Sequence, residues 1–278
     1  MRQPDDARRE DVPPPPEPLA VPVLDSHTHL DIVGGDPVAG IEAARAVGVT
    51  RLVQVGVDVD SSRWGVELAE REPAVLATVA LHPNEAPRLA DLDEALRAIE
   101  GLARRDRVRG LGETGLDHFR TAEVGREVQE RSFRAHIQIA KDTGKALVIH
   151  DRDAHSDVLR VLDDEGAPDT VVLHCFSGGE SFAVECAKRG YVLSFAGTVT
   201  FKNAPHLRAA ARATPLEQIL VETDAPFLTP TPYRGRPNGS YLVPLTVRAL
   251  AAARDDDLDE LCAAISATGE RVFGSWHG

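Results

Sequence analysis

The sequence predicts a single α/β domain with the (β/α)8 TIM-barrel fold. Short apolar segments alternate with helical segments over about 250 residues, a pattern that indicates a parallel sheet covered by helices. There are eight such segments, and polar side chains follow six of them. A closed barrel gathers these residues from all around its mouth, whereas an open doubly wound sheet gathers them at one crevice. We therefore favour the closed barrel over the open sheet.

The expected strands are short apolar runs separated by helical segments or turn residues. They span residues 21–24, 49–57, 74–81, 108–111, 146–149, 170–173, 191–195 and 218–222. The polar residues that end six of these runs are therefore expected at one end of the barrel.

The expected helix boundaries follow from capping residues. Asp36 followed by Pro37 starts the first helix, and Gly48 ends it. Serines at 61–62 open the second helix, and Gly144 caps the fourth. The helices are expected at 37–47, 61–72, 91–105, 125–143, 154–164, 180–189, 205–213, 243–254 and 258–273.

The first 20 residues differ in composition from the rest of the chain. Residues 1–20 are polar, charged and rich in proline, so we expect a disordered or extended tail ahead of a barrel domain at 21–278.

No apolar run approaches the roughly 20 residues of a membrane span. The cysteines Cys175, Cys186 and Cys262 show no close spacing, which favours a reducing, cytoplasmic compartment. We interpret all three as small buried residues.

The formal net charge of −13 restricts the possible partners. A protein that binds long nucleic acid electrostatically is usually basic. Any contact with nucleic acid is therefore expected to be local, through metal ions and a few arginines.

His27 and His29 form a possible pair of metal ligands after the first strand. Side chains two residues apart on a strand point to the same face, so both imidazoles project together. Neutral imidazole is the commonest nitrogen ligand of zinc-like ions. Alone, such a pair is more often a polar strand end than a metal site, so the interpretation depends on the other strand ends.

Those strand ends supply further ligand types. The full set is His27, His29, Glu113, His150, His174 and Asp224. Six such residues are too many for one tetrahedral ion. They suit two metals about 3.5–4 Å apart that share a carboxylate.

Five stretches of the chain resemble a known family. They are 25–29 (Asp-Ser-His-Thr-His), 110–117 (Gly-Leu-Gly-Glu-Thr-Gly-Leu-Asp), 148–152 (Val-Ile-His-Asp-Arg), 174–178 (His-Cys-Phe-Ser-Gly) and 222–226 (Glu-Thr-Asp-Ala-Pro). From about residue 22 onwards the chain is similar to the TatD-like metal-dependent hydrolases, within the amidohydrolase group of barrels. The resemblance implies a divalent-metal-dependent deoxyribonuclease that often acts from a 3′ end.

The resemblance also implies a role for each ligand. His27, His29 and Asp224 would hold the first metal, and His150 and His174 the second. Glu113 would bridge the two metals.

The chain departs from the family pattern at the loop over the barrel mouth. The family usually has Arg-Asn-Glu-Pro there, whereas residues 235–240 read Gly-Arg-Pro-Asn-Gly-Ser and lack the glutamate. Thr114 and His118 also differ from the usual isoleucine and aromatic residue. These departures concern the substrate loop and not the expected metal ligands.

Two residues are expected to act in catalysis. Glu113 is the shared ligand, and Asp224 can accept a proton from the attacking water and pass it to the leaving oxygen. The candidate substrate contacts are His82, His118, Arg120, Arg152, Arg234 and Arg236. Arginine suits bidentate phosphate contacts, although each arginine alone is more often part of a surface ion pair, and His82 is equally a wall residue.

Three functions remain open from the sequence. The favoured function is hydrolysis of phosphodiester bonds of DNA or a short oligonucleotide, from single-stranded ends, by a monomer with two divalent metals. The alternative is a dinuclear hydrolase of a carboxylic ester or amide, such as an aminoacyl-tRNA deacylase. A barrel that binds metal without catalysis is the third, and the complete ligand set argues against it. Zinc, manganese, iron or cobalt fit the ligands better than magnesium, although added magnesium can still support activity.

Overall fold

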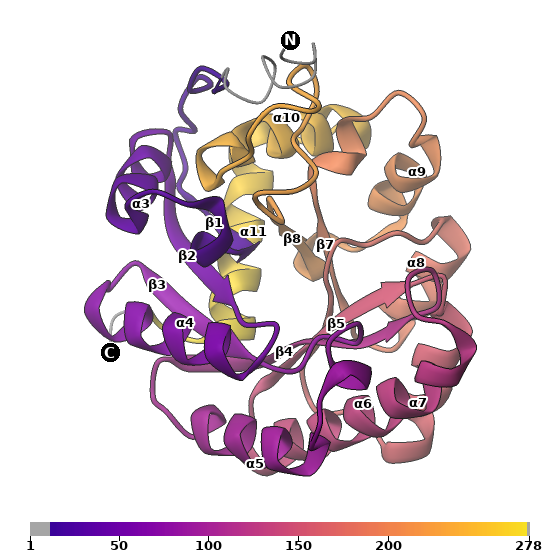
Figure 1. The fold of residues 1–278 in the computed structure, drawn as a ribbon. Coiled ribbons are helices and arrows are strands. Elements are labelled where there is room, and N and C mark those ends of the chain that lie inside the picture. Colours follow the sequence, from indigo (N-terminus) through magenta and orange to yellow (C-terminus); the bar gives the residue numbers. More distant parts are fainter. Residues whose placement is uncertain (1–11, 277–278) are drawn as a thin grey trace, which may run out of the picture.

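The computed structural model describes residues 12–276. Eight parallel strands follow one another in chain order around a barrel, and the helices surround them (Figure 1). The strands are β1 (Val23–Thr28), β2 (Val49–Val55), β3 (Val75–Val79), β4 (Val108–Asp117), β5 (Ala146–Arg152), β6 (Val171–Leu173), β7 (Val192–Phe195) and β8 (Ile219–Val221). The predicted single-domain TIM barrel is confirmed.

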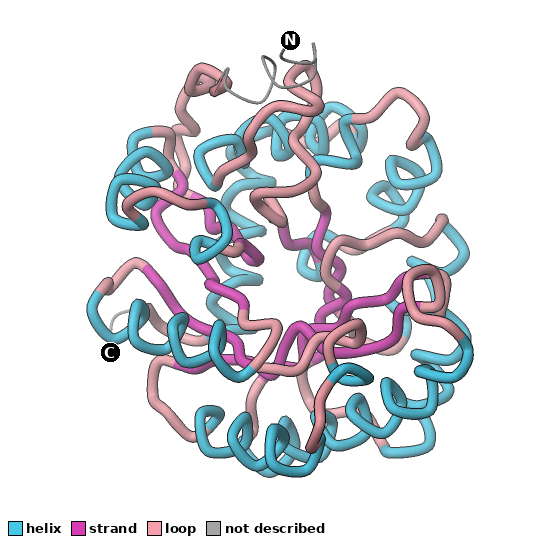
Figure 2. Tube along the Cα trace, viewed as in Figure 1, coloured by secondary structure: helices cyan, strands magenta, loops and turns pink. Residues whose placement is uncertain are grey.

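The helices form the outer layer in cyan around the magenta strands (Figure 2). They are α2 (Leu30–Val33), α3 (Pro37–Ala46), α4 (Val59–Arg71), α5 (Leu92–Ala103), α6 (Glu123–Thr143), α7 (His155–Glu165), α8 (Glu180–Lys188), α9 (Pro205–Ala213), α10 (Val243–Arg254) and α11 (Leu258–Phe273). The short α2 was not predicted. No helix in the described part of the chain is long and apolar enough to cross a membrane.

Strands β1, β4 and β5 extend further than predicted, into the polar residues at the barrel mouth. The expected end of β4 was residue 111, but its pairing with β5 continues from Thr114 opposite Ile149 to Asp117 opposite Arg152. Polar residues resemble a loop in the sequence, yet a neighbouring strand supplies their backbone partners here. The extension places Glu113 and Asp117 within one strand.

Two glycines allow β4 to approach β5 closely. A Cβ atom at Gly115 would lie 2.2 Å from the carbonyl oxygen of His150, and the φ of Gly115 is +134°. A Cβ atom at Gly112 would lie 2.4 Å from the Cβ of Val148. Only glycine fits such an approach without displacing the neighbouring strand. This contact brings Glu113 beside His150.

The barrel closes between its first and last strands. The His29 amide donates to the Ala225 carbonyl, and the Asp224 amide donates to the His27 carbonyl, both at 2.9 Å. Below them, the Thr223 hydroxyl donates to Asp25 at 2.6 Å. Helix α11 packs against β1 and β8 and covers this seam from outside (Figure 1). The seam therefore lies directly at the His27–His29 pair.

The end of the predicted tail packs on the barrel. Residues 12–20 contain no helix or strand, but the Tyr241 hydroxyl donates to the Pro13 carbonyl at 3.0 Å. The Leu19 amide donates to Val47, and the Leu19 side chain is buried in the core. The predicted boundary at residue 20 therefore lies inside a segment that packs on the barrel. The Leu19 side chain and hydrogen bonds to backbone groups attach this segment. The rest of the predicted tail, residues 1–11, lies outside the described residues.

Candidate metal centre and active-site cleft

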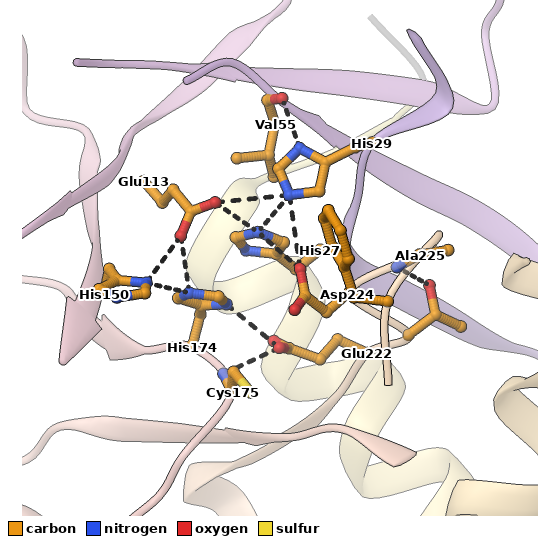
Figure 3. A network of polar contacts seen from close by, with 12 residues as sticks. His27, His29, Val55, Glu113, His150, His174, Cys175, Glu222, Asp224 and Ala225 are labelled. Atoms are coloured by element: carbon orange, nitrogen blue, oxygen red, sulfur yellow. Dashed lines mark hydrogen bonds and ion pairs between the residues drawn. The ribbon is translucent and has the colours of Figure 1, made fainter. Parts of the chain in front are cut away.

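Glu113 lies at the centre of the histidine cluster (Figure 3). Its Oε1 is 3.4 Å from Nε2 of both His27 and His29. Its Oε2 is 2.9 Å from Nε2 of His174 and 3.1 Å from Nδ1 of His150. Each oxygen of one carboxylate thus faces its own pair of imidazoles.

Asp224 completes the group around Oε1 of Glu113. Its Oδ1 lies 3.4 Å from Nε2 of His29 and 3.8 Å from Nε2 of His27. The Asp224 side chain is 14% exposed, whereas that of Glu113 is 5% exposed. The structure therefore brings all six predicted ligands together and leaves Asp224 as the more accessible of the two carboxylates.

His82 lies beside the second group, which consists of His150, His174 and Oε2 of Glu113, and follows the end of β3. Its Nε2 is 3.5 Å from Oε2 of Glu113, and its Nδ1 accepts a hydrogen bond from the Asn84 amide at 2.9 Å. Because Nδ1 is already hydrogen-bonded to the Asn84 amide, Nε2 is the nitrogen that faces the cluster. A place at the edge of the cluster fits a residue that meets substrate or supports the ligands.

The donor atoms suit divalent cations. Nε2 of His27 and Nε2 of His29 are 3.3 Å apart, and Nε2 of His174 and Nδ1 of His150 are 3.5 Å apart. In each group, two imidazole nitrogens and one oxygen of Glu113 lie close together, and Asp224 adds a further oxygen to the first group. Nitrogen and oxygen donors of this kind bind first-row divalent metals. The cluster can therefore hold metal ions, and three overlapping groups of its side chains have ligand atoms within 4.8 Å of one another.

The far nitrogen of three of these rings has its own partner. Nδ1 of His29 lies 3.2 Å from the Val55 carbonyl, which can only accept, so Nδ1 carries a proton and Nε2 is the atom that faces the cluster. Nδ1 of His174 lies 3.2 Å from Oε1 of Glu222, and Nε2 of His150 lies 3.2 Å from Oδ2 of Asp117. Such partners fix the orientation and tautomer of ligating histidines.

The sequence analysis gave no role to Asp117 or Glu222. Strand alternation would have indicated Asp117, four residues after Glu113, whereas Glu222 lies after the end of β8 and only its place beside Asp224 in the stretch 222–226 marks it. Alternation was not applied to Asp117 because β4 was expected to end at residue 111.

Electrostatics favour ionised carboxylates beside the imidazoles. Burial tends to raise the pKa of Glu113, but the imidazoles of His174, His82 and His150 hold it well below its usual range. Burial tends to lower the pKa of His29, but hydrogen bonds to Asp224 and Glu113 raise it to about 10. The cluster therefore attracts positive charge strongly, as protons or as cations.

A cleft of about 1010 Å³ opens over the cluster. Among the predicted substrate residues, His82, Arg120 and Arg152 line it. His118 does not: its Nδ1 lies 3.8 Å from Oδ2 of Asp157, on α7. Arg234 and Arg236 line a second cavity of about 490 Å³, and Leu228 borders both cavities.

Cys175 differs from its expected position. It lines the cleft and is partly exposed, whereas Cys186 and Cys262 are buried as expected. Strand β6 ends at Leu173, so the expected alternation does not reach Cys175, whose φ is +42°. The Cys175 amide donates to Oε1 of Glu222 at 2.8 Å, which stabilises this turn.

Comparison with known proteins identifies the family. A family model described as TatD related DNase matches residues 24–274. The chain belongs to the TatD family. An uncharacterized metal-dependent hydrolase named TatD, from Mycobacterium tuberculosis, is 45% identical over 260 residues, which cover 91% of this chain and 98% of that protein. The chain is therefore a metal-dependent hydrolase of the TatD family.

Two further relatives extend the comparison. A protein from Musicola paradisiaca named 3′-5′ ssDNA/RNA exonuclease TatD is 35% identical over 243 residues, or 84% of this chain and 90% of that protein. The crystal structure of YJJV, a TatD homologue from Escherichia coli K12, has a TM-score of 0.85 and 27% identity, and covers 91% of this chain and 98% of that one.

Proposed function

We propose that this protein is a dinuclear, divalent-metal-dependent nuclease that hydrolyses phosphodiester bonds at single-stranded ends of DNA. The observation that supports two metals most directly is the position of Glu113, whose two oxygens face two separate pairs of imidazoles. One carboxylate oxygen for each pair is the arrangement that two neighbouring cations require.

We propose the following ligand sets, which these distances support. His27, His29, Asp224 and Oε1 of Glu113 would hold the first cation. His150, His174 and Oε2 of Glu113 would hold the second. When bound, two such cations lower the pKa of a water toward neutrality and neutralise charge on a phosphoryl oxygen.

Asp224 is the proposed proton acceptor. Its side chain reaches the cleft, where it can accept a proton from the attacking water and donate it to the leaving oxygen. Glu113 is more deeply buried and hydrogen-bonded to imidazoles, so it stays ionised between the two groups. The two carboxylates therefore have different roles because they differ in access to the cleft.

Arg120 and Arg152 are proposed to bind phosphates beside the scissile one. Both line the cleft, and neither forms an ion pair with a carboxylate among residues 12–276. The Arg152 guanidinium instead lies over the Phe119 ring, 4.2 Å from its centroid. Unpaired guanidinium groups are suited to bidentate contacts with phosphate. Two local cations suffice for a strand end, whereas a net charge of −13 offers no path for a long duplex.

The departures in the loop at 235–240 leave the support of Asp224 intact. The Asn238 side chain donates to the Thr223 carbonyl at 3.0 Å and also to the Phe227 carbonyl. These bonds stabilise the turn on both sides of Asp224. The loop therefore has a structural role that does not require the missing glutamate.

The test is a metal-loaded assay with a single-stranded oligonucleotide labelled at either end, in added manganese or magnesium. Stepwise shortening from one end is expected, and Asp224→Asn should abolish it while Asp169→Asn, an exposed change at the opposite end of the barrel, should not. Elemental analysis should give two metals per chain.

Two results would overturn the proposal. A limit of one metal per chain under saturating conditions would exclude the shared role of Glu113. Intact nucleic acids together with cleavage of an aminoacyl ester would replace phosphodiester hydrolysis by the carboxylic-ester alternative.

A further inference from the structure

Exposed apolar side chains gather at the mouth of the cleft. The large exposed apolar residues of the described chain are Val12, Ile32, Val33, Val38, Phe119, Val124 and Phe227. Ile32, Val124 and Phe227 line the cleft, and Phe119 lies against Arg152, which also lines it. Scattered exposed apolar residues need no explanation, but a group around one opening marks a binding surface.

Phe227 is held rigidly beside the first ligand group. Its amide donates to the Asp224 carbonyl at 2.8 Å, and its carbonyl accepts from Asn238. Its ring lies edge-to-face with the His29 imidazole, at 6.3 Å between centroids, yet its side chain is 52% exposed. A large aromatic ring is thus fixed next to the catalytic centre and left largely uncovered.

Phe119 is connected to His150 of the second ligand group through Asp117. Its amide donates to Oδ1 of Asp117 at 2.9 Å, and Oδ2 of the same aspartate contacts His150. The residue is 63% exposed, and its ring carries the Arg152 guanidinium on one face. The pair of Phe119 and Arg152 therefore offers a planar apolar surface together with a positive charge.

Aromatic rings combined with unpaired arginines are suited to unpaired nucleobases. Bases stack on phenylalanine rings and on guanidinium planes, and arginine also binds the intervening phosphates. In a duplex the bases stack on one another, so their faces are not available to the protein. An acidic protein with this local surface favours a strand whose bases are free.

We propose that Phe227 and the Phe119–Arg152 pair are base-stacking sites that flank the metal centre and select single-stranded substrate. Phe227 receives the base on the side of His29, and the Phe119–Arg152 pair receives a base on the side of His150. This inference rests on the proposed nuclease function. It adds that the substrate must present an unstacked base to the protein.

The first experiment measures binding without hydrolysis. A short single-stranded oligonucleotide with 2-aminopurine near one end is titrated with metal-free and calcium-loaded protein, because stacking quenches the fluorescence of 2-aminopurine. Wild-type protein should quench it. Phe227→Leu keeps an apolar side chain but removes the ring, and should lose the quenching and weaken binding by about 5- to 100-fold, as expected for loss of one stacked base.

Two further variants serve as controls. Phe227→Trp restores a ring and should restore both quenching and affinity. Val38→Ala changes an exposed aliphatic residue that does not line the cleft, and should change neither. Metal content and thermal unfolding of each variant confirm that the centre and the fold are intact.

The second experiment separates this inference from the proposed function. Wild-type protein should cleave an oligonucleotide faster than the same strand with an abasic site beside the scissile phosphate, and Phe227→Leu should cleave both at similar rates. If wild type cleaves both strands equally, or if Phe227→Leu quenches as wild type does, stacking is overturned and the nuclease function stands. If wild-type protein neither binds nor cleaves any oligonucleotide, the proposed function itself fails and the inference fails with it.

Discussion

The two ends of the barrel use polar side chains in opposite ways. At the carboxyl ends of the strands, imidazoles and carboxylates face one another around Glu113. At the amino ends, long polar side chains face backbone carbonyls. The Arg107 guanidinium, directly before β4, donates to four carbonyls at 2.6–3.0 Å, those of Ala69, Pro73, Val75 and Trp276.

Two other strands begin in the same way. Lys145, directly before β5, donates to the carbonyls of Ala103 and Arg105. Gln218, directly before β8, donates to those of Ala187 and Tyr191, at 3.1 and 3.0 Å. Each donor meets an acceptor that the backbone already holds in place.

This difference shows how one set of strands serves stability at one end and chemistry at the other. At the amino end, these three side chains find their acceptors within the protein. At the carboxyl end, two pairs of imidazoles converge on one carboxylate, and Asp224, Cys175 and Leu228 have left-handed φ values of 52°, 42° and 57°. Such backbone conformations are costly and gather at functional sites, where the surrounding structure maintains them.

The largest effect is expected for Glu113→Ala, at the carboxyl end. Turnover should fall by about 10³-fold or more, because loss of a shared ligand should exceed the 10- to 100-fold effect of losing an outer hydrogen-bond partner. The unfolding temperature of the metal-free variant should remain near that of wild type, since the residue lies outside the packed barrel layers. Steady-state kinetics and elemental analysis measure the effect. Full metal content with near-normal turnover would exclude the shared role.

The second prediction concerns the amino end. Arg107→Met should lower the free energy of unfolding by about 3 kcal/mol, because charge-assisted hydrogen bonds to four backbone carbonyls are lost. Under conditions in which the variant is folded, kcat/KM should stay within about 2-fold of wild type. This change is small, because even a tenfold change in rate corresponds to only about 1.36 kcal/mol of activation free energy. Chemical denaturation and kinetics test this, with the exposed Arg97→Met as the control. A large loss of turnover in folded Arg107→Met would break the contrast between the two ends.

A smaller effect is expected for Asp117→Asn. The amide group of asparagine would face Nε2 of His150 as a donor and shift the imidazole proton to Nδ1, the atom that faces Glu113. Metal affinity should therefore fall by roughly 10- to 100-fold. Metal titration measures it, with Glu85→Gln in the same cleft as control. Unchanged affinity would show that Asp117 does not set the tautomer.

The smallest effect is a pH dependence of stability that comes from a histidine outside the cluster. Nε2 of His136, on α6, accepts from the Leu81 amide at 3.0 Å, and burial lowers the pKa of His136 to about 4. The unfolded imidazole, with a pKa near 6.5, binds protons first, so stability falls as pH decreases from about 6.5 toward 4. The loss between pH 7 and 5.5 should be about 1 kcal/mol. His136→Gln should reduce this loss in denaturation measured at each pH, and an unchanged slope would assign it to other groups.

The strand-end pattern was sufficient to predict the barrel and the residues that meet at its mouth. Apolar runs mark the strands, and a parallel barrel places all their carboxyl ends together. The structure brings the six candidate ligands into one cluster, and their roles as ligands stay predictions.

Other features depend on contacts between distant segments that no local pattern encodes. The extension of β4 to Asp117 depends on β5, which supplies backbone partners to a polar segment. The direction of His118 depends on Asp157, on α7. Leu19 belongs to the core because the Val47 carbonyl accepts its amide, although its neighbours in sequence resemble a tail.

The seam between β1 and β8 has a consequence for synthesis of the protein. Asp25 and Thr223, which bond across it, are 198 residues apart, so the seam forms only when the last strand has left the ribosome. His27 and His29 are made among the first residues, but Asp224 joins them only at that step. A growing chain can therefore fold its early βα units while the first ligand group is still missing. A hydrolase built in this way acquires its complete ligand cluster together with its last strand, and not before.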